Sequence, residues 1–353
     1  MRNITSLSVT NALAASQEKM SAAGCSLLAA FVSYDVPVKV PRETARAAFK
    51  DAGYFEIGKA CIPLLSPESA LRKANTQKKP PKGLAVKEFP NPHNASVSFG
   101  IFYSPTAVDG EAGDLTVGAR VRVNGDTNTV EVVPPEGEEK AHGPALRFGQ
   151  DLARRANGLI KFCETSDITS ALLAVLEKMH ALKLSKHGRG HIVLAARLST
   201  WGALMDRLSV HQVSTNMLSI WDLPDHILSA RESGRDSFIE QIRDLRQRCA
   251  DACGPERKGT RSDALQKSID ACATLINEAH LYAAILGDLV AGVEADVSKV
   301  KKVFDNLASG GSPTFSADLV MAPTSIDRPT EPEVSVEMDE NGDKVVTIPS
   351  AEA

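Results

Sequence analysis

A heptad repeat of apolar residues constrains the fold of this chain more than any other feature. Between residues 260 and 307, apolar side chains recur at alternating spacings of four and three residues for six heptads. A lone surface helix loses this register within a few turns, so a sustained period of about 3.5 residues indicates a helix whose apolar seam packs along another helix. We therefore predict one continuous helix of roughly 70 Å. Its seam is Leu265, Ile269, Cys272, Ile276, Ala279, Ala283, Leu286, Val290, Val293, Val297, Val300, Phe304 and Leu307.

The preceding segment supplies a first partner for this helix. Residues 225–253 carry apolar side chains at the same spacing, and only the short segment 254–259 separates the two arms. A short connection between two helices of this kind predicts an antiparallel coiled-coil hairpin. The second arm is the longer one, so its far half must contact either residues 5–31, where a heptad-like pattern predicts another helix, or a second copy of the chain. This predicted interaction seam is Leu286, Val290, Val293, Val297, Val300, Phe304 and Leu307.

In the middle of the chain the apolar period changes to two. Residues 97–103, 119–123 and 129–133 alternate as half-buried strands do, and Asn124-Gly125-Asp126 between the last two is a strong hairpin signal. Helices at about 144–162 and 167–182 and strands at 191–196 and 216–223 follow. The fold class that we predict is α+β, with a small mixed or antiparallel sheet that carries helices on one side, plus the C-terminal helical hairpin.

Changes in composition divide the chain into consecutive segments. With 353 residues, 43% of them hydrophobic, the chain is long enough for more than one core. Residues from 308 onward hold nine acids against Arg328 and Lys344, so the tail is acidic while the body is nearly neutral. Alternating residues on either side of 339–343 predict a small β-hairpin in this tail or a strand that joins a partner's sheet. The predicted segments are an N-terminal helical region (1–75), a basic linker (76–93), an α+β domain (94–223), the coiled-coil hairpin (224–308) and an acidic flexible tail (309–353).

Cysteine usage and hydropathy indicate where the protein resides. Six cysteines are spread over a long chain, which favours free thiols in a reducing compartment, so we expect a cytoplasmic protein. No stretch approaches the ~20 apolar residues of a membrane span, and we expect neither a signal peptide nor a membrane partner.

Candidate metal and phosphate sites have simpler interpretations. Cys249, Cys253, Cys272 and His280 could converge as a zinc site, but two of the cysteines occupy seam positions and small core residues explain them better. The segment 187–191, His-Gly-Arg-Gly-His, lacks the Lys-Ser/Thr ending of a phosphate loop and is typical of a polar turn. We expect no cofactor, no metal and no catalytic site, and we favour a non-enzymatic protein over an enzyme with a diffuse site near the sheet.

Two groups of basic residues are candidate binding surfaces. Residues 72–87 contain six Lys or Arg and no aromatic for base stacking, which favours a solvated linker over a nucleic-acid contact. The arginines of 225–253 alternate with acids and predict a solvated face with helical ion pairs. The residues that would contact nucleic acid in the alternative interpretation are Arg72, Lys73, Lys78, Lys79 and Lys82.

Two patches carry a resemblance to a known group of proteins. The strand Gly190-His-Ile-Val-Leu194 with Trp201, Leu204 and Met205 after it is one, and the segment 281–287 leading into the long heptad helix is the other. Together they resemble uncharacterised proteins encoded by tailed phages and plasmids, some of them beside MoxR-type AAA ATPases. The resemblance implies a mobile-element origin and an AAA ATPase as a candidate partner, and it supplies no catalytic residue.

These observations lead to an expected function. We expect a homo-oligomeric assembly or adaptor protein that acts through coiled-coil and protein–protein contacts. The alternative is a nucleic-acid-binding accessory factor of a phage or plasmid.

Overall fold

The computed structural model divides into two compact units, each assembled from separate segments of the chain. Unit 1 comprises residues 1–12, 34–179 and 199–215, and unit 2 comprises residues 13–33, 180–198 and 216–353. Each unit thus combines segments that the sequence analysis assigned to different domains. The structure describes residues 8–37, 39–89, 97–103, 115–134, 142–184, 190–253, 262–310, 323–327, 335–338 and 344–347, the last two ranges by their backbone only.

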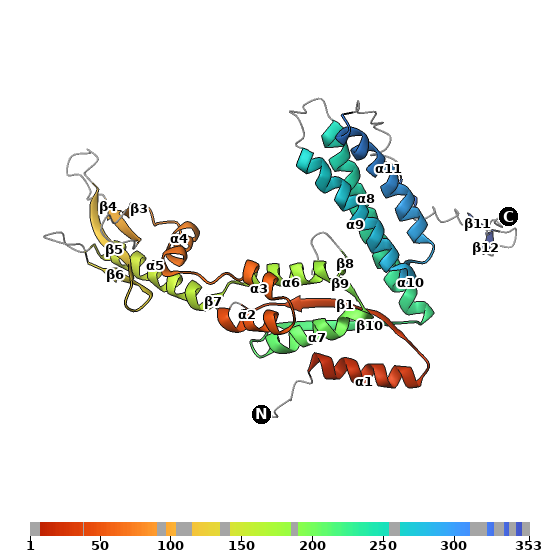
Figure 1. Ribbon diagram of the computed structural model, residues 1–353, viewed down its shortest axis with the longest axis horizontal. Coiled ribbons are helices and arrows are strands. Elements are labelled where there is room, and N and C mark those ends of the chain that lie inside the picture. The colour runs from red at the N-terminus through yellow and green to blue at the C-terminus, as the bar shows by residue number, and fades with distance from the viewer. Residues whose placement is uncertain are drawn as a thin grey trace. The chain divides into compact units, whose positions relative to one another are not determined.

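Unit 1 contains a four-stranded antiparallel sheet (Figure 1). Three of its strands confirm the predicted alternation and hairpin, whereas the fourth, Leu84–Phe89, lies in residues 76–93, which were predicted to be a linker. Helix α5 (Gly143–Lys161) packs on the sheet and α4 (Pro67–Gln77) packs on α5. The approach is close because a Cβ at Gly149 would lie 3.0 Å from Ile101. The strands, in sheet order, are β3 (Leu84–Phe89), β4 (Ser98–Tyr103), β5 (Thr116–Asn124) and β6 (Thr129–Val133).

Three further helices, most of a fourth and a two-residue ladder also belong to unit 1. Buried Arg42 fastens the first of these helices to neighbouring segments, since its guanidinium donates to the carbonyls of Leu159 (3.2 Å), Pro63 (2.9 Å) and Phe162 (3.1 Å). The elements are α2 (Arg42–Asp51), α3 (Phe55–Cys61), α6 (Thr165–Lys178) and α7 (Ala195–Ser209), with β2 (Val40–Pro41) antiparallel to β7 (Phe162–Cys163).

The N-terminal segment is only partly helical, so the prediction of a helix over residues 5–31 is wrong. Helix α1 (Val9–Ala22) ends before Gly24, whose φ of +77° suits glycine, and the chain continues as a strand. The strand contains the run Leu-Leu-Ala-Ala-Phe-Val, whose small and apolar residues fit a heptad as well as a strand buried in the middle of a sheet. The sheet order is β10 (Ser214–Trp221), β1 (Leu27–Asp35), β9 (His191–Leu194) and β8 (Leu182–Lys183).

Three helices form a bundle in unit 2 where two were predicted. The heptad helix is interrupted at Gly287, whose φ of +58° lies in the left-handed region, and the chain folds back after a single turn of helix. The last helix then packs against both earlier ones (Figure 1). The elements are α8 (Pro224–Cys253), α9 (Ser262–Leu281), α10 (Ala283–Leu286) and α11 (Leu289–Ala308).

The predicted interaction seam is therefore part of the protein's own core, and its assignment to a partner is corrected. Its far half packs against α8 and α9 because the break at Gly287 returns it along the chain's own helices. Val290 is partly buried. The other six residues are fully or almost fully buried: Leu286, Val293, Val297, Val300, Phe304 and Leu307.

The tail contains the predicted β-hairpin. β11 (Ser335–Met338) and β12 (Lys344–Thr347) pair antiparallel, with Ser335 opposite Thr347. The turn residues 339–343 lie outside the described residues. None of the helices within the described ranges combines the length and the apolar character that a membrane crossing requires.

Candidate functional site

The candidate site is a groove on the helical bundle that holds residues 323–327 of the same chain. Ile326 is 3% exposed and belongs to the bundle core. It fits against α11 because position 292 is glycine: a Cβ there would lie 2.5 Å from Cγ2 of Ile326 and 3.6 Å from the carbonyl oxygen of Ser325. Gly292 therefore forms a socket for an aliphatic side chain.

A buried ion pair binds the residue before Ile326. Asp296 of α11 and Arg246 of α8 are 1% and 2% exposed, and Asp296 Oδ1 lies 3.5 Å from Arg246 Nη2. The same carboxylate accepts hydrogen bonds from the backbone N–H of Ser325 (2.5 Å) and from its hydroxyl (2.8 Å). A buried carboxylate is stable only when it is paired and hydrogen-bonded, and here both requirements are met. The charge pair thus connects two helices to the segment.

The segment itself forms a compact turn that ends on a third charged group. Asp327 accepts a hydrogen bond from the N–H of Thr324 (2.6 Å) and donates its own N–H to the carbonyl of Thr324 (3.0 Å). Its other oxygen lies 3.4 Å from Arg243 of α8. The turn therefore presents Ser325 and Ile326 to the bundle.

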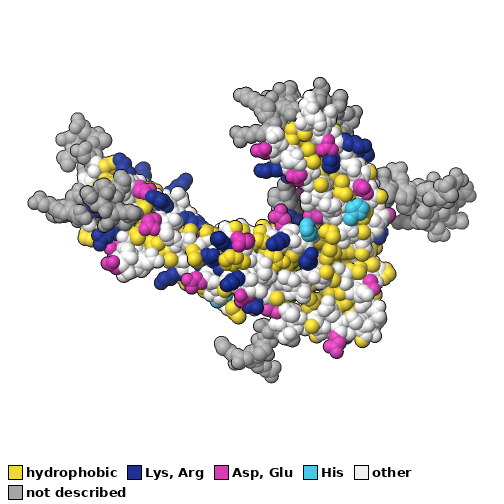
Figure 2. Space-filling model, viewed as in Figure 1, with side chains coloured by type: hydrophobic (Ala, Val, Ile, Leu, Met, Phe, Trp, Pro, Cys, Tyr) yellow, Lys and Arg dark blue, Asp and Glu magenta, His cyan; other side chains and the backbone are white. Residues whose placement is uncertain are grey.

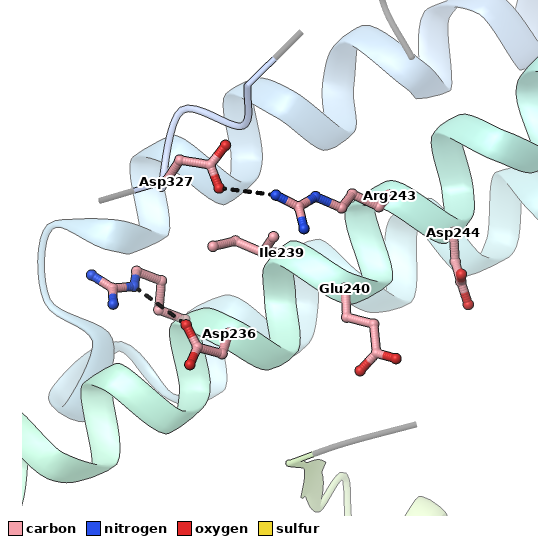
Figure 3. A pocket seen from close by; sticks show the side chains of 7 residues that line it. Asp236, Ile239, Glu240, Arg243, Asp244 and Asp327 are labelled. Atoms are coloured by element: carbon pink, nitrogen blue, oxygen red, sulfur yellow. Dashed lines mark hydrogen bonds and ion pairs between the residues drawn. The ribbon is translucent and has the colours of Figure 1, made fainter. Parts of the chain in front are cut away.

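Beside the segment is an open hollow of about 540 Å³ (Figure 3). In Figure 3 Arg243 and Asp327 point toward one another, while Glu240 and Asp244 point away from Asp327. The hollow lies along α8 next to Asp327 of the turn. The lining residues are Arg235, Asp236, Ile239, Glu240, Arg243, Asp244 and Asp327.

The arginines of α8 differ from the solvated face that the sequence predicted. Arg246 is buried in its pair with Asp296, and Arg231 donates to the carbonyl of Ile285 (3.2 Å). Sequence reasoning also missed Asp296, although a signal was present: Asp296 lies three residues after Val293 and directly before Val297, on the apolar face of its helix. An acid on such a face indicates a buried cationic partner.

The cysteines of the bundle are core residues. Burial, with smaller contributions from the neighbouring thiols of Cys253 and Cys272, raises the pKa of Cys249 to about 12. Burial raises the pKa of Cys272 to about 11. His280 lies 3.7 Å from Glu294, and no cluster of three His, Cys, Asp or Glu suited to a metal occurs within the described ranges. The thiols of Cys249 and Cys272 are therefore poor nucleophiles at neutral pH. Residues 187–189 of the predicted polar turn lie outside the described residues.

The basic residues of the nucleic-acid alternative lie on α4 and in the connection between α4 and β3, and three of the five are paired. Arg72 pairs with Glu88 (2.8 Å), Lys73 with Glu164 (2.8 Å) and Lys78 with Asp151 (2.7 Å). Lys79 and Lys82 are exposed. Figure 2 shows basic and acidic side chains interspersed on the visible face, so the cations do not form a continuous stripe there.

Comparisons with known proteins add no relative. No family model matches the chain, and searches of curated proteins and of solved structures gave no match. The fold and the groove alone define the class: an α+β protein with a three-helix bundle that holds a peptide segment.

Proposed function

We propose that this protein is a non-enzymatic assembly or adaptor protein whose helical bundle binds short peptide segments. The observation that carries the proposal is the seating of Ser325 and Ile326, one on the buried Asp296 carboxylate and the other in the socket at Gly292. An apolar anchor in a socket, combined with a buried group that bonds the peptide backbone, is a general way to recognise a segment. The expected ligand has a small hydroxyl residue, then an aliphatic residue, then an acid.

In the isolated chain the groove is occupied by its own segment. Fourteen residues lie between Ala308 and Pro323, and such a linker spans up to roughly 46 Å when extended. The return from the end of α11 to Asp296 is only about 18 Å along the helix axis. A tether of this length gives an effective concentration on the order of millimolar, so a partner segment must compete with the chain's own.

A peptide-binding experiment on the full chain tests the proposal. The probe is a fluorescein-labelled peptide of residues 320–330, and the protein is the Ile326→Asp variant, which releases its own segment because a carboxylate cannot enter the apolar socket. We expect fluorescence anisotropy to show the variant binding the peptide about tenfold or more tightly than the wild-type chain does.

Two controls make the result decisive. A probe that itself carries Asp at position 326 should not bind, and adding Gly292→Val to the Ile326→Asp chain should abolish binding because the socket is filled. Equal binding by the wild-type and Ile326→Asp chains, or equal binding of both probes, would overturn the proposal.

The origin, location and partners of the protein are inferred from the sequence alone. The mobile-element origin, the cytoplasmic location, the AAA ATPase partner and self-association remain predictions. A nucleic-acid-binding role also remains a prediction, and the acids beside Arg72, Lys73 and Lys78 weigh against it because they lower the net positive charge that would attract a polyanion. Binding to DNA that weakens steeply with added salt would favour that role.

A further inference from the structure

A second pocket lies wholly within unit 1, between the C-terminal half of α5 and the start of α6. Its volume is about 710 Å³, which is within the range of small-molecule sites. The floor consists of Gly158, Leu159, Phe162 and Cys163, and Leu159 and Cys163 are each 3% exposed. Burial raises the pKa of the Cys163 thiol to about 11, so this floor is uncharged at neutral pH.

The rim of the pocket is cationic. Lys39, Lys78, Arg154 and Arg155 line it together with only two acids, Asp151 and Glu164. Asp151 accepts hydrogen bonds from Lys78 (2.7 Å) and from Arg154 (3.2 Å), and the hydrogen bond from Lys78 holds the pKa of Asp151 below its usual value. The acids thus orient their cations without neutralising the rim, whose excess is two positive charges.

Glu164, like Asp151, accepts a hydrogen bond from a cation of the rim. It accepts from Arg155 (2.7 Å), and Lys73, which does not line the pocket, approaches it to 2.8 Å. Asp167 of α6 pairs with buried Arg42 (3.2 Å) and also accepts from the N–H of Glu164 (3.2 Å). This N–H is therefore satisfied internally, and the anion would be held by the rim side chains. Lys39 forms no ion pair within the described part of the chain.

We infer that this pocket binds an organic phosphate with an apolar body. The apolar body would lie on the floor formed by Gly158, Leu159 and Phe162, and the phosphate would lie among Lys39, Arg154 and Arg155. An arginine has five N–H donors and a lysine three, so a cation that already bonds one carboxylate can also bond a phosphate. The inference is independent of the peptide groove, since all of its residues belong to the other unit.

The test separates the phosphate from the apolar body. Titration calorimetry on the full chain compares phenyl phosphate with inorganic phosphate, which lacks the body, and with phenol, which lacks the charge. We expect phenyl phosphate to bind about tenfold or more tightly than either one. Arg154→Gln should weaken phenyl phosphate and leave phenol unchanged, because it removes one rim charge.

A glycine on the pocket floor allows a blocking variant. A Cβ at Gly158 would meet no heavy atom within 4 Å, and the position lies inside α5, so methionine fits the helix and fills the pocket. Gly158→Met should reduce the affinity for phenyl phosphate about tenfold or more. Gln150→Met places the same side chain on an exposed position of α5 and should leave it unchanged. Unaltered binding by Gly158→Met, or equal binding of inorganic and phenyl phosphate, would overturn the inference.

Discussion

At the scale of single residues, the pair of Arg246 and Asp296 has the largest expected effect on stability. Asp296→Ala leaves Arg246 buried without its carboxylate, and breaking a buried pair in this way costs about 3–5 kcal/mol of unfolding free energy. The measurement is urea unfolding followed by circular dichroism. Asp305→Ala is the matched control on the same helix, because its pair with Lys301 is partly exposed and its loss should cost less than ~1 kcal/mol. Equal losses in the two variants would contradict this account.

Tyr282 couples the bundle to the sheet of unit 2. Its hydroxyl accepts from the N–H of Leu182 (3.0 Å) and lies 2.9 Å and 2.7 Å from the carbonyl oxygens of His180 and Ile192, one of which it can donate to. Tyr282→Phe leaves that N–H buried and unpaired, so we expect a loss of about 1–3 kcal/mol in urea unfolding. A loss below about 0.5 kcal/mol would show that this hydroxyl is replaceable.

The same tyrosine predicts how stability changes in alkali. Burial raises the pKa of Tyr282 above its ordinary value of 10, so the folded state keeps the proton where the unfolded state has begun to release it. Its contribution to stability is complete below pH 10 and declines as the pH rises beyond it. The wild-type chain should therefore lose more stability than Tyr282→Phe between pH 9 and pH 11. Parallel declines in urea unfolding would contradict the prediction.

Glu164 predicts the opposite dependence in acid. Burial alone would raise the pKa of Glu164, but hydrogen bonds from Lys73 and Gln77 outweigh it, and the pKa lies below its ordinary value of 4.5. The contribution is present above that value and is lost as the pH falls through the folded-state pKa. Glu164→Gln should thus lower the melting temperature more at pH 7 than at pH 3. An equal difference at both values would assign Glu164 a purely steric role.

At the scale of elements, the glycine that separates α10 from α11 decides the shape of the bundle. Gly287 has a φ of +58°, and a Cβ there would lie 2.5 Å from the Arg231 guanidinium. Gly287→Ala should cost about 1–2 kcal/mol in urea unfolding because left-handed backbone disfavours a side chain. Gly158→Ala is the opposite control: it lies in open space inside a helix and should stabilise by about 0.5–1 kcal/mol. A neutral Gly287→Ala would mean that the fold-back needs no glycine.

The elements also show which parts of the fold the sequence could predict. Strands β4, β5 and β6 and the Asn124-Gly125 hairpin were predictable because alternation and turn chemistry are local, whereas β3 lies in residues whose basic composition predicted a linker. The break in the heptad helix was not, because the four-three spacing of seam residues continues unchanged from α9 into α11 and suits a three-helix bundle as well as a coiled coil. Residues 281–286 favour a helix, so Gly287 was the only residue of the segment 281–287 that indicated the break.

The candidate sites depend on contacts that no local pattern records. Asp296 is recognisable as an acid on an apolar face, but its bonds to Ser325 join residues 29 positions apart. The segment 323–327 has no helical or strand period, and its burial follows from the Gly292 socket. The cationic pocket likewise combines residues from Lys39 to Ser166, which adjoin only in the folded unit.

At the scale of the whole molecule, the chain alternates between the two units instead of completing one before it begins the next. Unit 2 starts at residue 13, stops at residue 33, and is resumed only at residue 180. A single cut therefore cannot release unit 1 intact. Shortened versions of the protein should keep residues 13–33 and 180–353 together.

This alternation has a consequence for the newly made protein. β1 leaves the ribosome early, yet it pairs with β9, where Ala29 lies opposite Leu194, and with β10. At about 5–20 residues per second, translation takes on the order of ten seconds to reach those partners. During that interval the run from Leu27 to Val32 is an apolar strand with both edges unpaired, the kind of segment that chaperones bind and that aggregates when they are scarce.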